Sequence, residues 1–138
     1  MAKFKYVAEF EINASVKMLF PYLSTPTGLS EWFAEKVQIV NPEERIYNIV
    51  WDGVGHLAKL TVLQQNRHVK FVFLPEGEED KKDPSFLEFK LTHSEMTETS
   101  FLKIIDYSSI DNEEDLKNLW NTLIHTLCEL IGAKENQI

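Results

Sequence analysis

The chain has 138 residues, of which 43% are hydrophobic, and this length suits one domain, residues 1–138, with a single substantial core. Its 14 basic and 22 acidic residues give a net charge of −8, and the basic residues form no cluster, so we predict no nucleic-acid partner. No apolar run approaches the ~20 residues of a membrane-spanning helix, and we expect no membrane span and a cytoplasmic location.

The N-terminal segment KFKYVAEFEI predicts a half-buried strand, because its aromatic residues alternate with mostly charged ones. Ser15 follows as a candidate N-cap for a helix over SVKMLFPYL, where apolar residues recur at helical spacing. Pro21 should bend or end this helix, because proline has no backbone N–H to donate.

Two aromatic residues end the next predicted element. Thr25 can cap a second short helix with Pro26 at its first position, where the missing N–H has no cost. Trp32 and Phe33 lie three and four residues after Leu29, so the three side chains share one side of an amphipathic helix. They need a large apolar surface to cover.

Beyond these helices the apolar pattern changes to a period of two, which is typical of strands. The alternating segments are separated by turns such as Asn41-Pro42 and Asp52-Gly53, or by the acidic loop PEGEEDKKDPS. They are KVQIV, RIYNIVW, GHLAKLTVL, HVKFVFL, SFLEFKLTH and TSFLKIIDY. Together with the first strand they predict a curled antiparallel sheet of about seven strands.

The last predicted element is a long helix within DNEEDLKNLWNTLIHTLCELIGA. Asp111 or Asn112 can cap it, and Gly132 can end it. A ridge at Ile124 and Cys128 either widens its buried face or supports a homodimer. Its main apolar stripe consists of Leu116, Leu119, Trp120, Leu123, Leu127, Leu130 and Ile131.

This order of elements resembles the helix-grip fold of the START/Bet v 1-like (SRPBCC) superfamily. Within it, FEINASVKMLFPYLSTPTGLSEWF and DLKNLWNTLIHTLCEL resemble the family related to the Hsp90 ATPase activator. The resemblance implies an α+β fold in which a curled antiparallel sheet wraps around a long C-terminal helix, with two short helices after the first strand. It also implies that Trp32 and Phe33 close one end of a groove between sheet and helix.

A curled sheet under one helix leaves either a packed core or a cavity for a small molecule. We predict an apolar groove that binds a hydrophobic small molecule or lipid. Alternation and the helix stripe assign to its lining Trp32, Phe33, Trp51, Phe71, Phe73, Phe89, His93, Trp120 and Ile124. In TSFLKIIDY the buried face is ambiguous, because Lys103 is in register with Phe101 and Ile105.

The sequence is also consistent with two other functions, a chaperone-associated protein and an enzyme. The resemblance allows a chaperone partner, as in an Hsp90-activator-like protein. Some members of the superfamily are cyclases or hydrolases, and His56 or His93 would be the acid–base candidates here. No acid or nucleophile near them in sequence pairs with either histidine, so we predict a binding domain rather than an enzyme. The histidines and Cys128 have no metal-ligand spacing, and we expect neither a metal nor a cofactor.

Overall fold

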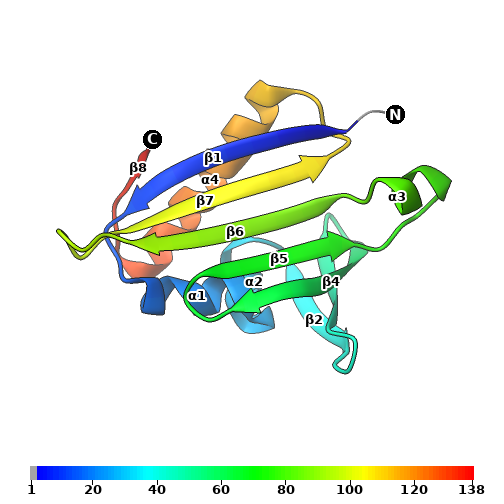
Figure 1. Cartoon of the computed structure of the whole chain (residues 1–138), viewed down its shortest axis with the longest axis horizontal. Helices are drawn as coiled ribbons and strands as arrows, with labels where there is room; N and C mark the ends of the chain where they lie inside the picture. Colours follow the sequence, from blue (N-terminus) through cyan, green and yellow to red (C-terminus); the bar gives the residue numbers. More distant parts are fainter. Residues whose placement is uncertain (1–2) are drawn as a thin grey trace.

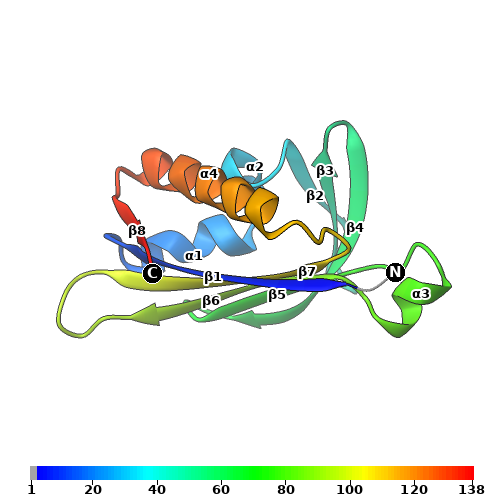
Figure 2. The same ribbon diagram turned by 90° about the horizontal axis from the view of Figure 1, so that it is seen from above.

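The computed structural model describes residues 3–138, which form one antiparallel sheet covered by helices on one face (Figures 1 and 2). The eight strands have the order β2-β3-β4-β5-β6-β7-β1-β8. In chain order they are β1 (Phe4–Ile12), β2 (Lys36–Asn41), β3 (Ile46–Trp51), β4 (Val54–Gln64), β5 (His68–Phe73), β6 (Phe86–His93), β7 (Ser100–Ser108) and β8 (Glu135–Gln137).

The helices are α1 (Val16–Ser24), α2 (Pro26–Trp32), α3 (Glu78–Lys82) and α4 (Glu113–Ile131). Figure 2 shows α1, α2 and α4 on the same side of the sheet, while β3 and β4 curve toward them at one end. This α+β helix-grip arrangement, with two short helices after the first strand and a long C-terminal helix, confirms the predicted fold class. No helix within residues 3–138 is long and apolar enough to cross a membrane.

The predicted helix caps are confirmed. Ser15 Oγ accepts a hydrogen bond from the Met18 N–H at 3.1 Å, and Thr25 Oγ1 accepts one from the Gly28 N–H at 3.0 Å. Gly132 ends α4 in the left-handed conformation with φ of 68°, which glycine adopts without steric cost. Of the two predicted caps of α4, Asn112 is the one that the structure shows. Its Oδ1 accepts a hydrogen bond from the Asp115 N–H.

Pro21 lies inside α1, which continues to Ser24, so of the two predicted effects this proline does not end the helix. Two local features differ from the sequence predictions. The acidic loop contains the short helix α3. An eighth strand, β8, pairs with β1 although its three polar residues carry no apolar alternation. Backbone hydrogen bonds, such as Ile138 N–H to Glu9 O at 2.8 Å, hold β8 in place, and these bonds do not depend on side-chain type.

The core lies between the sheet and α4, and the buried face of α4 differs from the predicted stripe. Leu119 and Leu130 are 45% and 47% exposed, so their assignment to that stripe is wrong. The helix buries a row spaced by four residues instead, and Ile124 and Cys128 widen its buried face. The buried residues of α4 are Leu116, Trp120, Ile124, Leu127 and Cys128.

The central strands β6 and β7 turn alternate residues toward α4. In β7, Leu102 and Ile104 are fully buried and Lys103 is exposed, which resolves the ambiguous face of this strand. In β6 the predicted inward residues from Leu87 to Leu91 are buried, but His93 is exposed, so it is not part of the core. His93 lies at the end of the strand, beyond Lys90, where the pairing with β5 ends.

Candidate functional site

A mostly apolar pocket with a volume of about 430 Å³ opens beside α4, near the curled ends of β3 and β5. This volume is in the range of small-molecule binding sites. We call it the aromatic pocket, and its lining residues are Phe33, Trp51, Asp52, Phe73, Leu87, Asp106, Ser108, Ile110, Leu119, Trp120 and Leu123.

The walls of the aromatic pocket are aromatic rings in mutual contact. The Phe33 ring meets the Trp51 ring edge to face, with centroids 5.0 Å apart, and stacks on Trp120 at 5.9 Å. Phe33 and Trp120 are buried, whereas Leu119 and Ile110 are exposed. The rings therefore form the inner part of the pocket, and the two aliphatic side chains stand at its mouth.

Hydrogen bonds fix the rings of this pocket in position. The Trp51 Nε1–H donates to the backbone oxygen of Phe33 at 2.9 Å, which ties the end of α2 to β3. The neighbouring Trp32 Nε1–H donates to the backbone oxygen of Tyr22 at 2.8 Å and so ties α2 to α1. Because each indole has a partner, the rings are held in one arrangement before any ligand arrives.

A carboxylate stands against the aromatic rings. Asp106 lies on β7 and shares the inward face of that strand with Leu102 and Ile104. Its Oδ2 accepts a hydrogen bond from the Trp120 Nε1–H at 2.9 Å. Burial raises the pKa of Asp106, and the hydrogen bonds from Trp120 and Ser108 oppose that rise only in part. The pocket therefore combines an apolar wall with one partly desolvated acid.

Comparison with known protein families identifies the superfamily of this chain. The model of the START-like superfamily domain matches residues 1–133. The chain belongs to the START-like superfamily. Comparison with curated protein sequences finds no match.

Solved structures of similar fold include three that bear on this START-like protein. Protein MLL2253 from Mesorhizobium loti is 18% identical with a TM-score of 0.73, and the match covers 94% of this chain and 97% of that protein. The Aha1 dimer from Colwellia psychrerythraea is 18% identical with a TM-score of 0.65, covering 93% and 92%. An Hsp90 activator from Plasmodium falciparum is 15% identical with a TM-score of 0.66, covering 99% and 100%. These likenesses support the predicted helix-grip fold.

The START-like domain brings four of the nine predicted lining residues together in the aromatic pocket. These four are Phe33, Trp51, Phe73 and Trp120. Four others belong to the core behind or beside the pocket and do not line it, namely Trp32, Phe71, Phe89 and Ile124. Trp32 and Phe89 still support the pocket, because the Phe89 ring lies 6.2 Å from that of Phe33. His93, the ninth, is exposed at the end of β6.

Asp106, the main polar group of the pocket, was not among the residues predicted from the sequence. The signal was present in the alternation of β7, since Asp106 follows Leu102 and Ile104 at intervals of two. The buried face was ambiguous because the opposite face carries both Lys103 and the apolar Ile105. Ile105 is itself only 6% exposed. An acid that continues the series of buried apolar residues Leu102 and Ile104 indicates a carboxylate on the inward face of the strand.

The two histidines named as acid–base candidates do not line the aromatic pocket. His56 packs its ring against Trp51, with centroids 5.4 Å apart, and so lies behind the pocket wall. His93 is at the far end of β6, as described above. Among the side chains that the structure describes, no group of three or more His, Cys, Asp or Glu residues is arranged to hold a metal ion.

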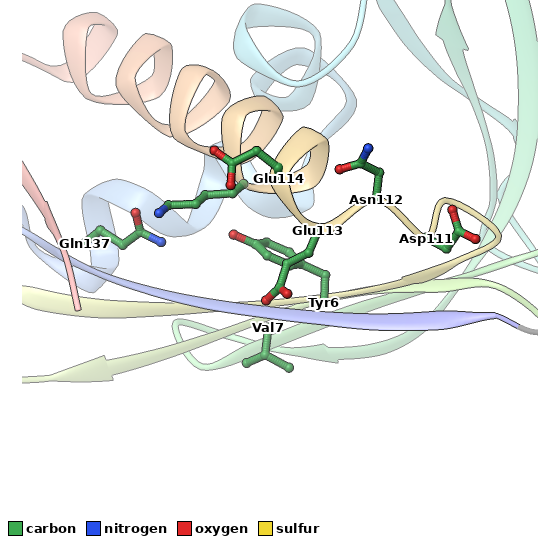
Figure 3. A pocket seen from close by; sticks show the side chains of 8 residues that line it. Tyr6, Val7, Asp111, Asn112, Glu113, Glu114 and Gln137 are labelled. Atoms are coloured by element: carbon green, nitrogen blue, oxygen red, sulfur yellow. The ribbon is translucent and has the colours of Figure 1, made fainter.

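A second and larger hollow, with a volume of about 820 Å³, lies beside the start of α4 and is mainly polar (Figure 3). It is lined by Tyr6, Val7, Asp111, Asn112, Glu113, Glu114, Lys117 and Gln137. Glu113 and Glu114 belong to the first turn of α4 and Asp111 precedes its cap, and negative charge at this end of a helix interacts favourably with the helix dipole. This accounts for the cluster in structural terms, and the aromatic pocket is the stronger candidate site.

Cys128 provides a prediction about reactivity. The side chain is 1% exposed, and burial, with the negative Glu135 nearby, raises the pKa of its thiol to about 12. Since the thiolate is the reactive form, the folded protein should react with a thiol reagent such as DTNB far more slowly than the protein unfolded in guanidinium chloride. Equal rates in the two states would contradict the buried position of this cysteine.

Proposed function

We propose that this START-like chain is a binding domain that holds a hydrophobic small molecule or lipid in the aromatic pocket. The observation that carries the proposal is a mostly apolar pocket of about 430 Å³ with aromatic walls and an open mouth. Its two indole rings are hydrogen-bonded in place, so little of their conformational entropy is lost when a ligand binds. An apolar molecule that fills the pocket is stabilised by roughly 25 cal/mol for each Å² removed from water.

Native mass spectrometry of freshly purified protein is the direct test. We expect a retained apolar molecule, or uptake of an added one in a one-to-one ratio. Thermal unfolding gives a second measurement, because a ligand present at a hundred times its Kd stabilises the folded state by about 2.7 kcal/mol. If a broad set of apolar molecules near their solubility limits neither binds nor raises the melting temperature, the proposal is wrong.

A matched pair of leucines on α4 tests the position of the site. Leu119 lies at the pocket mouth and Leu130 lies outside it, while their exposures are nearly equal at 45% and 47%. With the neutral fluorescent probe N-phenylnaphthylamine, Leu119→Gln should raise Kd about tenfold, because an apolar contact worth ~1.5 kcal/mol is replaced by a hydrated amide. Leu130→Gln should leave the Kd unchanged. Equal effects of the two substitutions in a fluorescence titration would place the probe elsewhere.

A second candidate function is association with an Hsp90-type chaperone. It is supported by the fold shared with the Colwellia Aha1 dimer and the Plasmodium Hsp90 activator, both below 20% identity. The test is the ATPase rate of an Hsp90 with and without this chain. An increase that Leu119→Gln leaves intact would favour the chaperone role over ligand binding in the aromatic pocket.

A further inference from the structure

The ionisable side chains that line the aromatic pocket are both acids. Among the described lining residues, Asp52 stands at the mouth and Asp106 lies against the inner rings, and none is a lysine, arginine or histidine. The chain as a whole carries a net charge of −8, which adds to the negative potential at this opening. A charged ligand that enters the pocket is therefore favoured when it is a cation.

Among the described residues, Asp106 also has no positively charged partner. Across residues 3–138 it takes part in no salt bridge, and its hydrogen bonds come from the neutral groups of Trp120 and Ser108. A carboxylate has about four acceptor positions, so capacity remains for a further donor. Buried charges in proteins are normally paired, and a ligand ammonium group would supply the missing partner.

The energetics of Asp106 point away from a purely structural role. Burial raises its folded-state pKa above the unfolded value. A raised carboxyl pKa means that ionisation destabilises the folded state, and this loss of stability grows as the pH rises through the folded pKa. An uncharged amide at this position could accept the same Trp120 hydrogen bond without that loss. A charge kept at the expense of stability is typical of a functional position.

The aromatic walls suit the same kind of ligand. The faces of Phe33, Trp51 and Trp120 carry negative electrostatic potential and attract an organic cation within about 6 Å of a ring centroid. The indole of Trp120 is joined to Asp106 at 2.9 Å, so a cation that contacts this ring lies close to the carboxylate. Ring and carboxylate then act on one positive group.

We infer that the aromatic pocket selects an apolar cation, meaning a protonated amine joined to an aromatic or aliphatic body. The ammonium group donates to the Asp106 carboxylate, and the body fills the space between Phe33, Phe73 and Leu123. This inference rests on the proposed function, because it names the class of ligand for the same pocket. It adds a charge requirement that an apolar pocket alone does not impose.

Three probes of equal size and different charge test the inference by isothermal titration calorimetry near neutral pH. Phenylbutylamine is a cation, phenylbutanol is neutral and phenylbutyrate is an anion. We expect the amine to bind the natural chain about tenfold more tightly than the alcohol, which is the strength of one charge-assisted hydrogen bond, and the anion to bind most weakly.

Asp106→Asn removes the charge and keeps an acceptor for the Trp120 indole. It should abolish the preference for the amine over the alcohol. Asp111→Asn is the matched control, because it changes the net charge equally but lies outside the aromatic pocket. This variant should keep the preference. We also expect Asp106→Asn to melt at the same or a higher temperature than the natural chain, since the desolvated charge is gone.

A pH series on the natural chain tests the same point without a variant. As the pH falls through the raised pKa of Asp106, the amine should lose affinity because it stays charged while its partner becomes neutral. The affinity for the alcohol should not change over the same pH range. The other titratable groups around Asp106 are Asp52 at the mouth and Tyr6, its register partner on β1, and the pKa of Tyr6 lies far above this range.

The outcomes separate the two proposals. If none of the three probes binds and no other apolar molecule does, the proposed function and this inference both fail. If the alcohol binds as tightly as the amine, or if Asp106→Asn keeps the preference for the amine, the binding proposal stands and the cation inference is overturned. Loss of the amine preference in both Asp106→Asn and Asp111→Asn would assign the effect to overall charge and would also overturn it.

Discussion

Replacement of Trp120 by alanine is expected to lower the free energy of unfolding by ~3–5 kcal/mol in a guanidinium chloride titration. The side chain is 2% exposed and its ring contacts Phe33 and Phe89, so its removal leaves a cavity at the centre of the core. It also removes the indole donor that binds Asp106 at 2.9 Å, which leaves a partly desolvated carboxylate with one partner fewer.

Two variants separate these effects. Trp120→Phe keeps a ring in the core but lacks the indole N–H, so its smaller loss reports the hydrogen bond to Asp106 together with the size difference. Leu130→Ala, at a position of the same helix that is 47% exposed, should cost less than about 1 kcal/mol. A loss below about 1 kcal/mol for Trp120→Ala would show that this residue is not part of the core.

Much of the fold could be predicted because it follows from local rules. Ser15 and Thr25 begin helices since their hydroxyls satisfy free N–H groups, and each alternating apolar run between two turns formed a strand at the expected place. The helix-grip arrangement follows from the order of these elements, because one long apolar helix is what a curled sheet of this size can cover.

The parts that could not be predicted depend on contacts between distant segments. β8 is held by backbone hydrogen bonds to β1, and its sequence Glu135–Gln137 gives no sign of them. His93 has the correct parity to face the core, yet it is exposed at the end of β6, beyond the last residue paired with β5. Parity gives the face of a strand, but the elements that pack on that face decide whether it is covered.

The candidate site could also be predicted only in part. Aromatic residues at core positions could be named from spacing, but a ring that lines a pocket and a ring that fills the core have the same pattern, as Phe73 and Phe71 on one strand illustrate. The distinction depends on how β3 and β4 curve toward the helices at one end of the sheet. Asp106 was not predicted because Lys103 and Ile105 left the buried face of its strand ambiguous in the sequence.

Gly28→Ala is the second substitution with a large expected effect, at about 3 kcal/mol of destabilisation or more. A Cβ at this position would lie 2.3 Å from the backbone oxygen of Pro21 and 2.6 Å from the Tyr22 Cα. Both atoms belong to the backbone of α1, so the clash is relieved only if α2 moves as a whole. That movement would strain the Trp32 hydrogen bond to Tyr22 and shift Phe33 in the aromatic pocket.

The matched control is Gly77→Ala, because a Cβ there meets no atom within 4 Å and the backbone is not in the left-handed region. It should change stability by less than about 0.5 kcal/mol. Chemical denaturation measures the loss, and a fluorescence titration with N-phenylnaphthylamine measures the displacement of Phe33 as weaker binding. Since α2 reaches the pocket through its C-terminal residue, Gly28→Ala should reduce both stability and affinity. If stability falls and affinity does not, the position of Phe33 is set by its bond to Trp51 rather than by the contact of α2 with α1.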